Sequence, residues 1–412
     1  MPERPPTPSF KQAQCQLTRQ FSDGSPSDMA YQIKGSHVPP VSAMTPCRAG
    51  LVAKHSKLLL QDATVHRTCL GMPLNPGTFR QRITDPRRLR AMKVRAAVEQ
   101  EVRAFFTGRE FTETRTPLLV PCPGMETHIR PISTSRGSYL PTSPEFSMKK
   151  LLVGGLERIF QICPAFRDEP HSAHHSPEFT LLEWYRAHSG YEEVMRDTEE
   201  LIAGLAVSLL GKPFIHHQGR KIDVSTPWPR LKVRDLFLEQ GVDLIRSASP
   251  EAMRAECIRL GLDPGSAEVK SWDDYTFLIW LNLIEPRLPQ DRAVFVMLYP
   301  PSQAALAVLQ NDPDGTRWAR RFEAYAGGLE LCNAFEELTD PLEQRRRFEA
   351  DMELREKTYG AAFPRTPLDE GFLTALEEGM PPSGGNALGV DRLVMLLADE
   401  PDIDYTLWLP SV

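Results

Sequence analysis

Two adjacent glycines, Gly327 and Gly328, constrain the fold more than any other feature of the sequence. They join two runs of β-type residues, 320–326 and 329–338. A two-residue turn between strands needs positive φ angles, which glycine adopts without a steric penalty. Strands joined by so short a link must pair antiparallel, because a parallel pair needs a long crossover. The sequence therefore predicts an antiparallel hairpin at this point.

Apolar residues at spacings of three and four predict helices, and alternating runs predict further strands. In chain order, the expected elements are a helix over 91–105 ending near Gly108, strands over 158–166 and 178–186, a helix over 194–209 that Gly211 ends, and a helix over about 390–398. Hairpin-linked strands with helices outside them indicate an α+β fold built on an antiparallel sheet, not a parallel βαβ series.

The first 82 residues differ in composition from the rest. They contain ten prolines and seven serines without a sustained apolar period, a mixture that favours turns and disorder. Residues 1–80 hold 9 Lys and Arg against 4 Asp and Glu, whereas the remainder holds 39 against 50. We expect a disordered, basic N-terminal extension over 1–82 and one globular domain over 83–412.

Several classes of protein are disfavoured. The seven cysteines are scattered and never form C-x-x-C, so neither a disulfide framework nor a zinc site is indicated. No apolar stretch approaches the roughly 20 residues of a membrane span. The first ten residues lack the apolar core of a signal peptide. These features predict a cytoplasmic protein that does not enter a membrane.

Residues 166–185 form the first candidate for chemistry, with the pattern of strand, polar loop and strand. On the second strand, the two-residue period places Phe179, Glu183 and Tyr185 on one face, together with Leu181. A surface that combines an aromatic ring, a carboxylate and a phenol suits ligand binding. The alternative is a structural role, in which Phe179 is a core residue and Glu183 pairs with a nearby arginine. For this segment taken alone, that role is the more common one.

Two carboxylates on the hairpin form the second candidate. A two-residue turn pairs Tyr325 with Glu330 and Glu323 with Cys332, which places both glutamates on one face. Two carboxylates at that range repel each other unless a cation lies between them, and oxygen ligands with nucleotide phosphates suit Mg²⁺. The alternative is a pair of solvated surface glutamates, the commoner position of this residue.

The third candidate is the glycine-rich segment 384–389 and the helix after it. Glycines let a backbone approach a flat ligand closely, and Arg392 at the helix start can hold a phosphate. Neither a P-loop nor a G-x-G-x-x-G motif occurs, so the nucleotide-binding classes that use them are disfavoured.

In this order, the three segments resemble the motifs of class II aminoacyl-tRNA synthetases, most closely the lysyl branch, over roughly residues 90–410. Residues 114–119 (TRTPLL) resemble motif 1, whose proline lies at the dimer interface of that family. Residues 166–180 resemble motif 2, and residues 389–392 (GVDR) resemble motif 3. The resemblance implies the synthetase catalytic domain, use of ATP and Mg²⁺, and a homodimer.

Two features of the sequence indicate one subfamily. Lysyl-tRNA synthetases have an N-terminal OB-fold that grips the anticodon, and residues 1–82 lack the five-strand pattern for one. Residues 299–306 (YPPSQAAL) and 387–392 (ALGVDR) are similar to elongation factor P lysine ligases, which are stand-alone paralogues. That family activates (R)-β-lysine as an adenylate and transfers it to a lysine side chain of elongation factor P. The resemblance implies the same ATP-dependent ligase reaction here.

The resemblance also assigns roles to residues. Arg167 and Arg392 would be the catalytic residues, because a guanidinium stabilises the charge that develops at the α-phosphorus. ATP would be bound by Arg167, Glu169, His175, Phe179, Gly389 and Arg392, and Mg²⁺ by Glu323 and Glu330. The substrate, (R)-β-lysine or lysine, would be bound by Glu145, Glu183, Tyr185, Cys332, Asn333, Phe335 and Glu337. Several carboxylates around one cavity suit a ligand with two ammonium groups.

The sequence departs from the family in three places. The motif 2 loop normally carries an arginine for the distal phosphates, but residues 170–174 contain none, so a histidine must substitute. Cys332 replaces the glycine of lysyl-tRNA synthetases and the alanine usual in stand-alone ligases, which leaves the choice between β-lysine and α-lysine open. Strict alternation would also separate Glu330 from Asn333, so we predict a β-bulge near Cys332–Asn333.

Three other functions are alternatives, and a feature of the sequence disfavours each of them. A truncated synthetase that charges tRNA is disfavoured because phosphate backbones need a basic surface and residues 81–412 are acidic. A non-catalytic amino-acid sensor would have lost its phosphate and metal residues, yet these are present. An asparagine synthetase of the same fold is disfavoured by the trio Asn333, Phe335 and Glu337.

Overall fold

The computed structural model describes residues 78–265, 271–363 and 365–409. Most of the predicted extension, residues 1–77, lies outside these ranges. Residues 79–82 were expected to lack fixed structure, which is wrong, because they belong to helix α1 (Phe79–Ile83). Thr78 stabilises its start: the hydroxyl accepts from the Gln81 backbone at 3.3 Å, and the Gln81 side chain accepts from the Thr78 backbone at 2.7 Å.

The elements expected from the sequence occur in the expected order, together with further helices and strands that were not expected. The helices are α2 (Pro86–Thr107), α3 (Glu145–Val153), α4 (Tyr191–Leu210), α5 (Val233–Glu239), α6 (Pro250–Arg259), α7 (Trp272–Ile279), α8 (Pro341–Tyr359), α9 (Glu370–Gly379) and α10 (Val390–Ala398). The strands are β1 (Thr112–Glu113), β2 (Arg158–Phe166), β3 (Glu178–Ala187), β4 (Phe214–His217), β5 (Arg220–Asp223), β6 (Arg230–Lys232), β7 (Val294–Tyr299), β8 (Leu309–Asn311), β9 (Arg317–Ala326), β10 (Leu329–Glu336) and β11 (Ser383–Gly389). Gly211 ends α4 with a φ of 75°.

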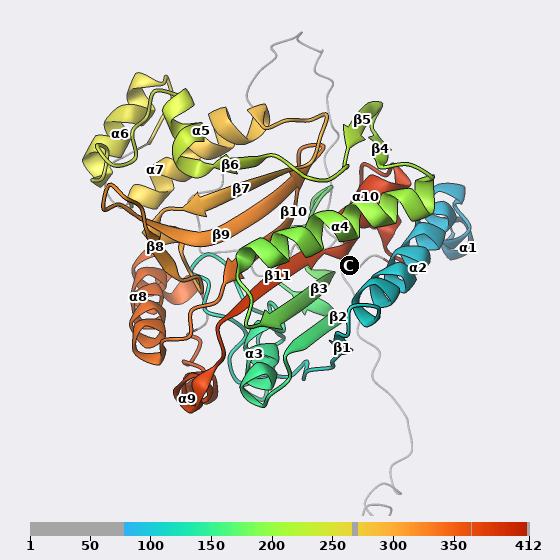
Figure 1. Cartoon of the computed structure of the whole chain (residues 1–412), viewed down its shortest axis with the longest axis horizontal. Helices are drawn as coiled ribbons and strands as arrows, with labels where there is room; N and C mark the ends of the chain where they lie inside the picture. Colours follow the sequence, from blue (N-terminus) through green and yellow to red (C-terminus); the bar gives the residue numbers. More distant parts are fainter. Residues whose placement is uncertain (1–77, 266–270, 364, 410–412) are drawn as a thin grey trace, which may run out of the picture. The chain divides into compact units, whose positions relative to one another are not determined.

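One mixed sheet of nine strands organises the described residues (Figure 1). Its order is β1-β2-β3-β11-β10-β9-β7-β6, with β8 paired to β9. The central pairs are antiparallel, whereas the end pairs β1–β2 and β6–β7 are parallel. The α+β prediction is confirmed, and the parallel pairs at the two ends of the sheet were not expected.

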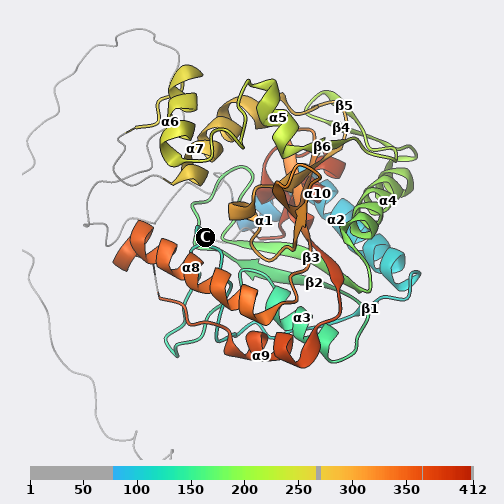
Figure 2. The ribbon, with the colours of Figure 1, turned by 60° about the vertical axis from the view of Figure 1, so that its left-hand side comes forward.

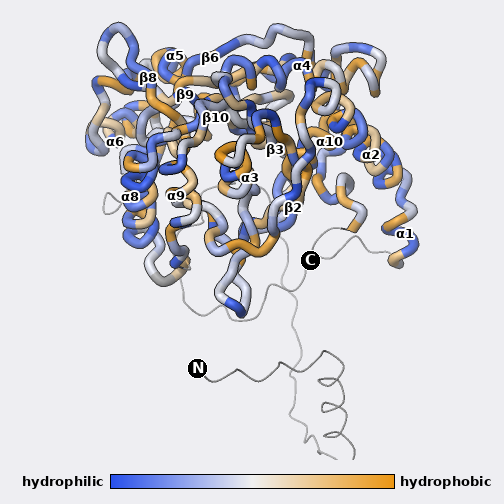
Figure 3. Tube along the Cα trace, turned by 60° about the horizontal axis from the view of Figure 1, so that its bottom comes forward, coloured by the Kyte–Doolittle hydropathy of each residue, from blue (hydrophilic) through white to orange (hydrophobic). Residues whose placement is uncertain are grey.

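Helices pack on the sheet in two groups. Helix α2 contacts both α4 and α10, and α4 and α10 pack on the central strands with a large apolar core between (Figure 1). Helices α3, α8 and α9 share a second apolar cluster, with α8 and α9 away from α2 and α4 (Figure 2). Helix α8 is mostly hydrophilic (Figure 3) and contributes Phe348 to that cluster. Trp184 of β3 lies in the first apolar core and its neighbour Tyr185 in the second, so the two helix groups cover opposite faces of this strand.

The predicted hairpin forms from β9 and β10. Gly327 and Gly328 have φ angles of 60° and 84°, as a two-residue turn requires. Tyr325 pairs with Glu330 as expected, but Glu323 pairs with Asn333 instead of Cys332, because the register shifts between Glu330 and Cys332. The predicted bulge is therefore confirmed, with Leu331 as the extra residue.

Strand β11 was not expected, because its sequence is rich in glycine, which is unfavourable in a strand. It lies between β3 and β10. A Cβ on Gly384 would be 2.6 Å from the Val194 side chain of α4, and one on Gly385 would be 2.3 Å from both Glu337 and Tyr185. These glycines let a helix and two site residues approach the strand closely.

We predict that Gly384→Ala destabilises the protein by about 1–3 kcal/mol, because the added methyl group would force α4 away from β11. Thermal unfolding measures this effect. Gly204→Ala is the matched control: Gly204 lies within α4 with open space around its Cβ position, and alanine there should stabilise the helix by roughly 0.5–1 kcal/mol. Equal transition temperatures for the two variants would contradict the packing argument.

Candidate functional site

A cluster of buried acidic residues, which we take as the candidate acidic pocket for substrate, forms where α3 meets the central strands. Lys149, fully buried, lies 2.5 Å from Glu145 Oε1 and 2.5 Å from Glu337 Oε2. Glu145 begins α3 and Lys149 follows one turn later, while Glu337 directly follows β10. Sequence reasoning selected both glutamates and missed Lys149, although its i, i+4 spacing from Glu145 was a usable signal.

Glu183 and Tyr185 of β3 complete this pocket. The Tyr185 hydroxyl donates to Glu183 Oε2 at 3.1 Å, and Glu183 is fully buried. Burial, and next the neighbouring Glu145, raises the pKa of Glu183 to about 8. Burial likewise raises the pKa of Glu337 to about 8 against the opposing effect of Lys149. Both carboxyl groups therefore lack enough positive charge around them.

The pocket has unsatisfied acceptors, and it carries more negative than positive charge once its carboxyl groups are ionised. Among the described residues, Glu183 Oε1 and Glu337 Oε1 are buried without a hydrogen-bond partner. Three carboxylates face one ammonium, so a ligand with two positively charged donors would balance the charge and satisfy these oxygens. The arrangement suits a small diamino compound.

A second group of residues lies around the β2–β3 loop and the start of α10. The Arg167 guanidinium lies 5.0 Å from the centre of the Phe179 ring. Arg392 donates to the backbone oxygen of Glu330 at 2.8 Å, and its guanidinium lies 3.7 Å from Glu330 Oε2. Two guanidinium groups and an aromatic face suit a nucleotide with its phosphates.

His175, which is expected to bind ATP, contacts Arg392. Arg392 Nη2 lies 2.9 Å from His175 Nε2, and Ser172 Oγ lies 2.9 Å from His175 Nδ1. Burial and then Arg392 lower the pKa of His175 to about 4, so the ring is neutral at physiological pH and accepts from Arg392. In this state it orients Arg392 and does not supply the positive charge of the missing loop arginine.

Glu323 and Glu330 lie on the same face of the hairpin. Tyr325 donates to Glu323 Oε2 at 2.7 Å, and Arg321 contacts Glu323 Oε1 at 2.5 Å. Burial and next Glu323 raise the pKa of Glu330 to about 7. Within the described residues no group of three His, Cys, Asp or Glu could hold a metal. Two carboxylates fit Mg²⁺ only if phosphate oxygens supply further ligands.

Cys332 does not line the pocket with the other predicted substrate residues. Its sulfur lies 3.4 Å from Asn386 Nδ2, which also donates to Thr198 of α4 at 2.8 Å. The bulge at Leu331 turns Cys332 toward α4 and keeps Asn333 on the face of Glu323. The expectation that Cys332 reshapes the substrate pocket directly is therefore wrong.

The remaining predicted residues have fewer contacts. Asn333 Oδ1 accepts from Arg321 at 2.9 Å, and the Arg321 guanidinium lies 6.0 Å from the Phe335 ring centre. Glu169 is half-buried and its backbone nitrogen donates to Arg167 at 2.8 Å. Gly389 caps the start of α10 without a side-chain bond. The roles of Glu169 and Gly389 stay predictions from the motifs.

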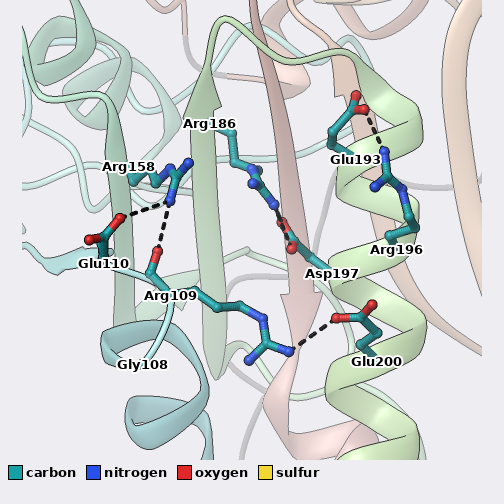
Figure 4. A pocket seen from close by; sticks show the side chains of 9 residues that line it. All are labelled: Gly108, Arg109, Glu110, Arg158, Arg186, Glu193, Arg196, Asp197 and Glu200. Carbon is teal, nitrogen blue, oxygen red and sulfur yellow. Dashed lines mark hydrogen bonds and ion pairs between the residues drawn. The ribbon is translucent and has the colours of Figure 1, made fainter.

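A cavity of about 350 Å³ lies elsewhere, between the end of α2, the strands β2 and β3, and α4 (Figure 4). Its charged side chains form four ion pairs, Arg109–Glu200, Arg158–Glu110, Arg186–Asp197 and Arg196–Glu193. Each arginine already has a carboxylate partner, so this cavity presents no uncompensated charge comparable to that of the acidic pocket. We place the site at the acidic pocket.

No helix among the described residues is long and apolar enough to cross a membrane.

The chain is similar in sequence to known proteins. The chain is 38% identical over 347 residues to the lysine–tRNA ligase of Moorella thermoacetica, which covers 81% of this chain and 68% of that protein. Over 347 residues it is 37% identical to that of Pelotomaculum thermopropionicum (81% and 66%). Over 356 residues it is 37% identical to that of Chromohalobacter salexigens (83% and 68%).

The chain thus spans about two thirds of the length of these relatives. Residues 79–412 also match the family described as tRNA synthetases class II (D, K and N). The match includes the central strands, the acidic pocket, Arg167 and Arg392. The chain therefore belongs to the class II tRNA synthetases of the D, K and N type and is an ATP-dependent ligase.

Proposed function

We propose that the protein activates (R)-β-lysine or lysine with ATP and transfers it to a lysine side chain of elongation factor P. The observation that carries the substrate class is the buried pocket of Glu145, Glu183 and Glu337, in which Lys149 neutralises only one carboxylate. A ligand with two ammonium groups satisfies both orphan oxygens, whereas a neutral side chain would leave them unpaired.

In the first step, a carboxylate oxygen of the amino acid attacks the α-phosphorus of ATP and the bond to pyrophosphate breaks. Arg167 and Arg392 would stabilise the negative charge on the phosphate oxygens, with Phe179 against the adenine face. Bound at Glu323 and Glu330, Mg²⁺ would neutralise phosphate charge. His175, which accepts from Arg392, would keep that guanidinium oriented toward the phosphates.

In the second step, an amine attacks the carbonyl carbon of the adenylate, AMP leaves, and an amide forms. Elongation factor P is our proposed acceptor because residues 299–306 and 387–392 resemble its lysine ligases. Such a reaction would take place in the cytoplasm, where ATP and translation factors occur. The second candidate is charging of tRNA, which the names of the lysine–tRNA ligase relatives favour.

The acceptor is tested by offering both substrates to one preparation. We expect lysine-dependent exchange of pyrophosphate into ATP, and a mass increase of one lysyl unit on elongation factor P with no aminoacylated tRNA-Lys. Charging of tRNA-Lys without modification of the factor would establish the second candidate instead. Absence of pyrophosphate exchange with α-lysine, (R)-β-lysine and (S)-β-lysine would indicate a non-catalytic sensor.

The pyrophosphate-exchange assay also tests the proposed role of Arg167 in binding the phosphates of ATP. Arg167→Ala should lower kcat/KM for exchange about 10²–10³-fold, as loss of one preorganised donor to transition-state charge does. Arg365→Ala is the control, since the Arg365 side chain is 87% exposed. Equal activity of the two variants would remove Arg167 from the catalytic residues.

We also propose a homodimer formed through residues 114–119, which resemble motif 1. Leu118 and Leu119 are 41% and 60% exposed, and burial of such apolar area favours association. Leu119→Glu should convert a dimer into a monomer in sedimentation velocity, whereas Leu342→Glu, at a side chain that is 77% exposed on α8, should not. A wild-type monomer, or dimers of both variants, would contradict this interface.

Substrate affinity should depend on pH. The pKa values of Glu183 and Glu337 are raised to about 8, so both are largely protonated below that pH, and a bound ammonium favours their ionised forms. Binding then releases protons, and affinity for lysine should rise up to about tenfold per pH unit for each such group between about pH 6 and pH 8. Calorimetry at several pH values measures it. Glu183→Gln should flatten the slope, and a wild-type affinity that falls over this range would refute the charge argument.

A further inference from the structure

Arg321, which neither the motifs nor the comparisons single out, connects the two ends of the site. It lies on β9, two residues before Glu323 and opposite Phe335 of β10. Its side chain is 16% exposed, and the guanidinium lies 4.2 Å from the centre of the Tyr299 ring. A buried guanidinium held against an aromatic ring has few alternative positions.

Each nitrogen of this guanidinium contacts a different acceptor. Nε donates to Asn333 Oδ1 at 2.9 Å, Nη1 to the backbone oxygen of Gln303 at 2.8 Å, and Nη2 to Glu323 Oε1 at 2.5 Å. The bond to Gln303 fixes the guanidinium to the backbone. The other two bonds reach Asn333, which is expected to bind substrate, and Glu323, which is expected to bind Mg²⁺.

The bond to Asn333 decides which way the amide of that residue points. Arg321 has only donors, so the amide must present its oxygen to Nε. Among the described residues, the side-chain hydrogen bond found for Asn333 is this one to its Oδ1, and none is found for its Nδ2. An amide held in this way offers N–H donors to a ligand, and the ligand group they suit is a carboxylate.

We propose that Arg321 is a positioning residue that holds Asn333 with its N–H donors toward the carboxylate of the amino acid and holds Glu323 on the metal side of the same site. Through the single side chain of Arg321, the orientation of the reacting carboxylate at Asn333 depends on the same guanidinium that holds Glu323. The ligand class rests on the proposed function, whereas the orientation of Asn333 does not.

The test measures lysine binding by calorimetry without ATP or metal, which separates it from catalysis. Arg321→Lys should weaken binding about tenfold, because a lysine cannot reach all three acceptors and frees the amide to flip. Arg320→Lys is the matched control. Arg320 is the neighbouring residue on the same strand, but its guanidinium contacts Glu336 at 2.9 Å and Glu192 at 3.2 Å instead. It should leave the affinity within about twofold.

A double-mutant cycle separates positioning from a general loss of structure. If Arg321 acts through Asn333, adding Arg321→Lys to Asn333→Ala should weaken lysine binding no further. Additive losses, an unchanged affinity of Arg321→Lys, or equal losses in Arg320→Lys would each overturn the inference.

A wild-type protein that binds no lysine isomer would refute the proposed function alone. The inference is then decided by the side-chain amide resonances of Asn333, assigned with Asn333→Ala. They should shift in Arg321→Lys and stay in place in Arg320→Lys. Unchanged resonances in Arg321→Lys would overturn the positioning role.

Discussion

The burial of three carboxylates beside a single lysine is the interaction on which the site depends. Charged groups taken out of water are costly unless they are paired. Here Lys149 pairs with Glu145 and Glu337, and Glu183 accepts from the Tyr185 hydroxyl. In the free protein, burial raises the pKa of Glu183 and Glu337, so both groups hold a proton more readily. A diamino ligand would displace these protons and put its ammonium groups in their place. The same deficit of positive charge thus defines both the state of the free site and the class of its substrate.

The sheet makes this burial possible by close backbone approach. Gly385 leaves space for Glu337 and Tyr185 on one face of β11, and Gly384 leaves space for α4 on the other. The bulge at Leu331 has a related effect on β10, because it places Glu330 and Asn333 on one face. Without these two local departures from a regular strand, Glu323 and Glu330 would not share a surface with Asn333 and Phe335.

Much of the fold was predictable from local patterns. The helix ends at Gly108 and Gly211, the strands before and after the motif 2 loop, and the turn at Gly327–Gly328 follow from periodicity and glycine conformation, which act over a few residues. Strand β11 was missed because its glycines oppose strand propensity, and only neighbours distant in sequence compensate for that. Lys149 was missed because its importance arises from Glu337, which is 188 positions away along the chain.

The sequence by itself determined several helices and strands, the hairpin, the synthetase motifs and the need for a bulge, since each depends on residue spacing within a short segment. Only the tertiary structure decided where charges meet: that Lys149 neutralises part of the pocket, that Cys332 faces α4, that His175 is a neutral acceptor for Arg392, and that Arg321 orients Asn333. The reason is that pKa values and hydrogen-bond directions depend on burial and on neighbours brought together by folding, which no local pattern specifies.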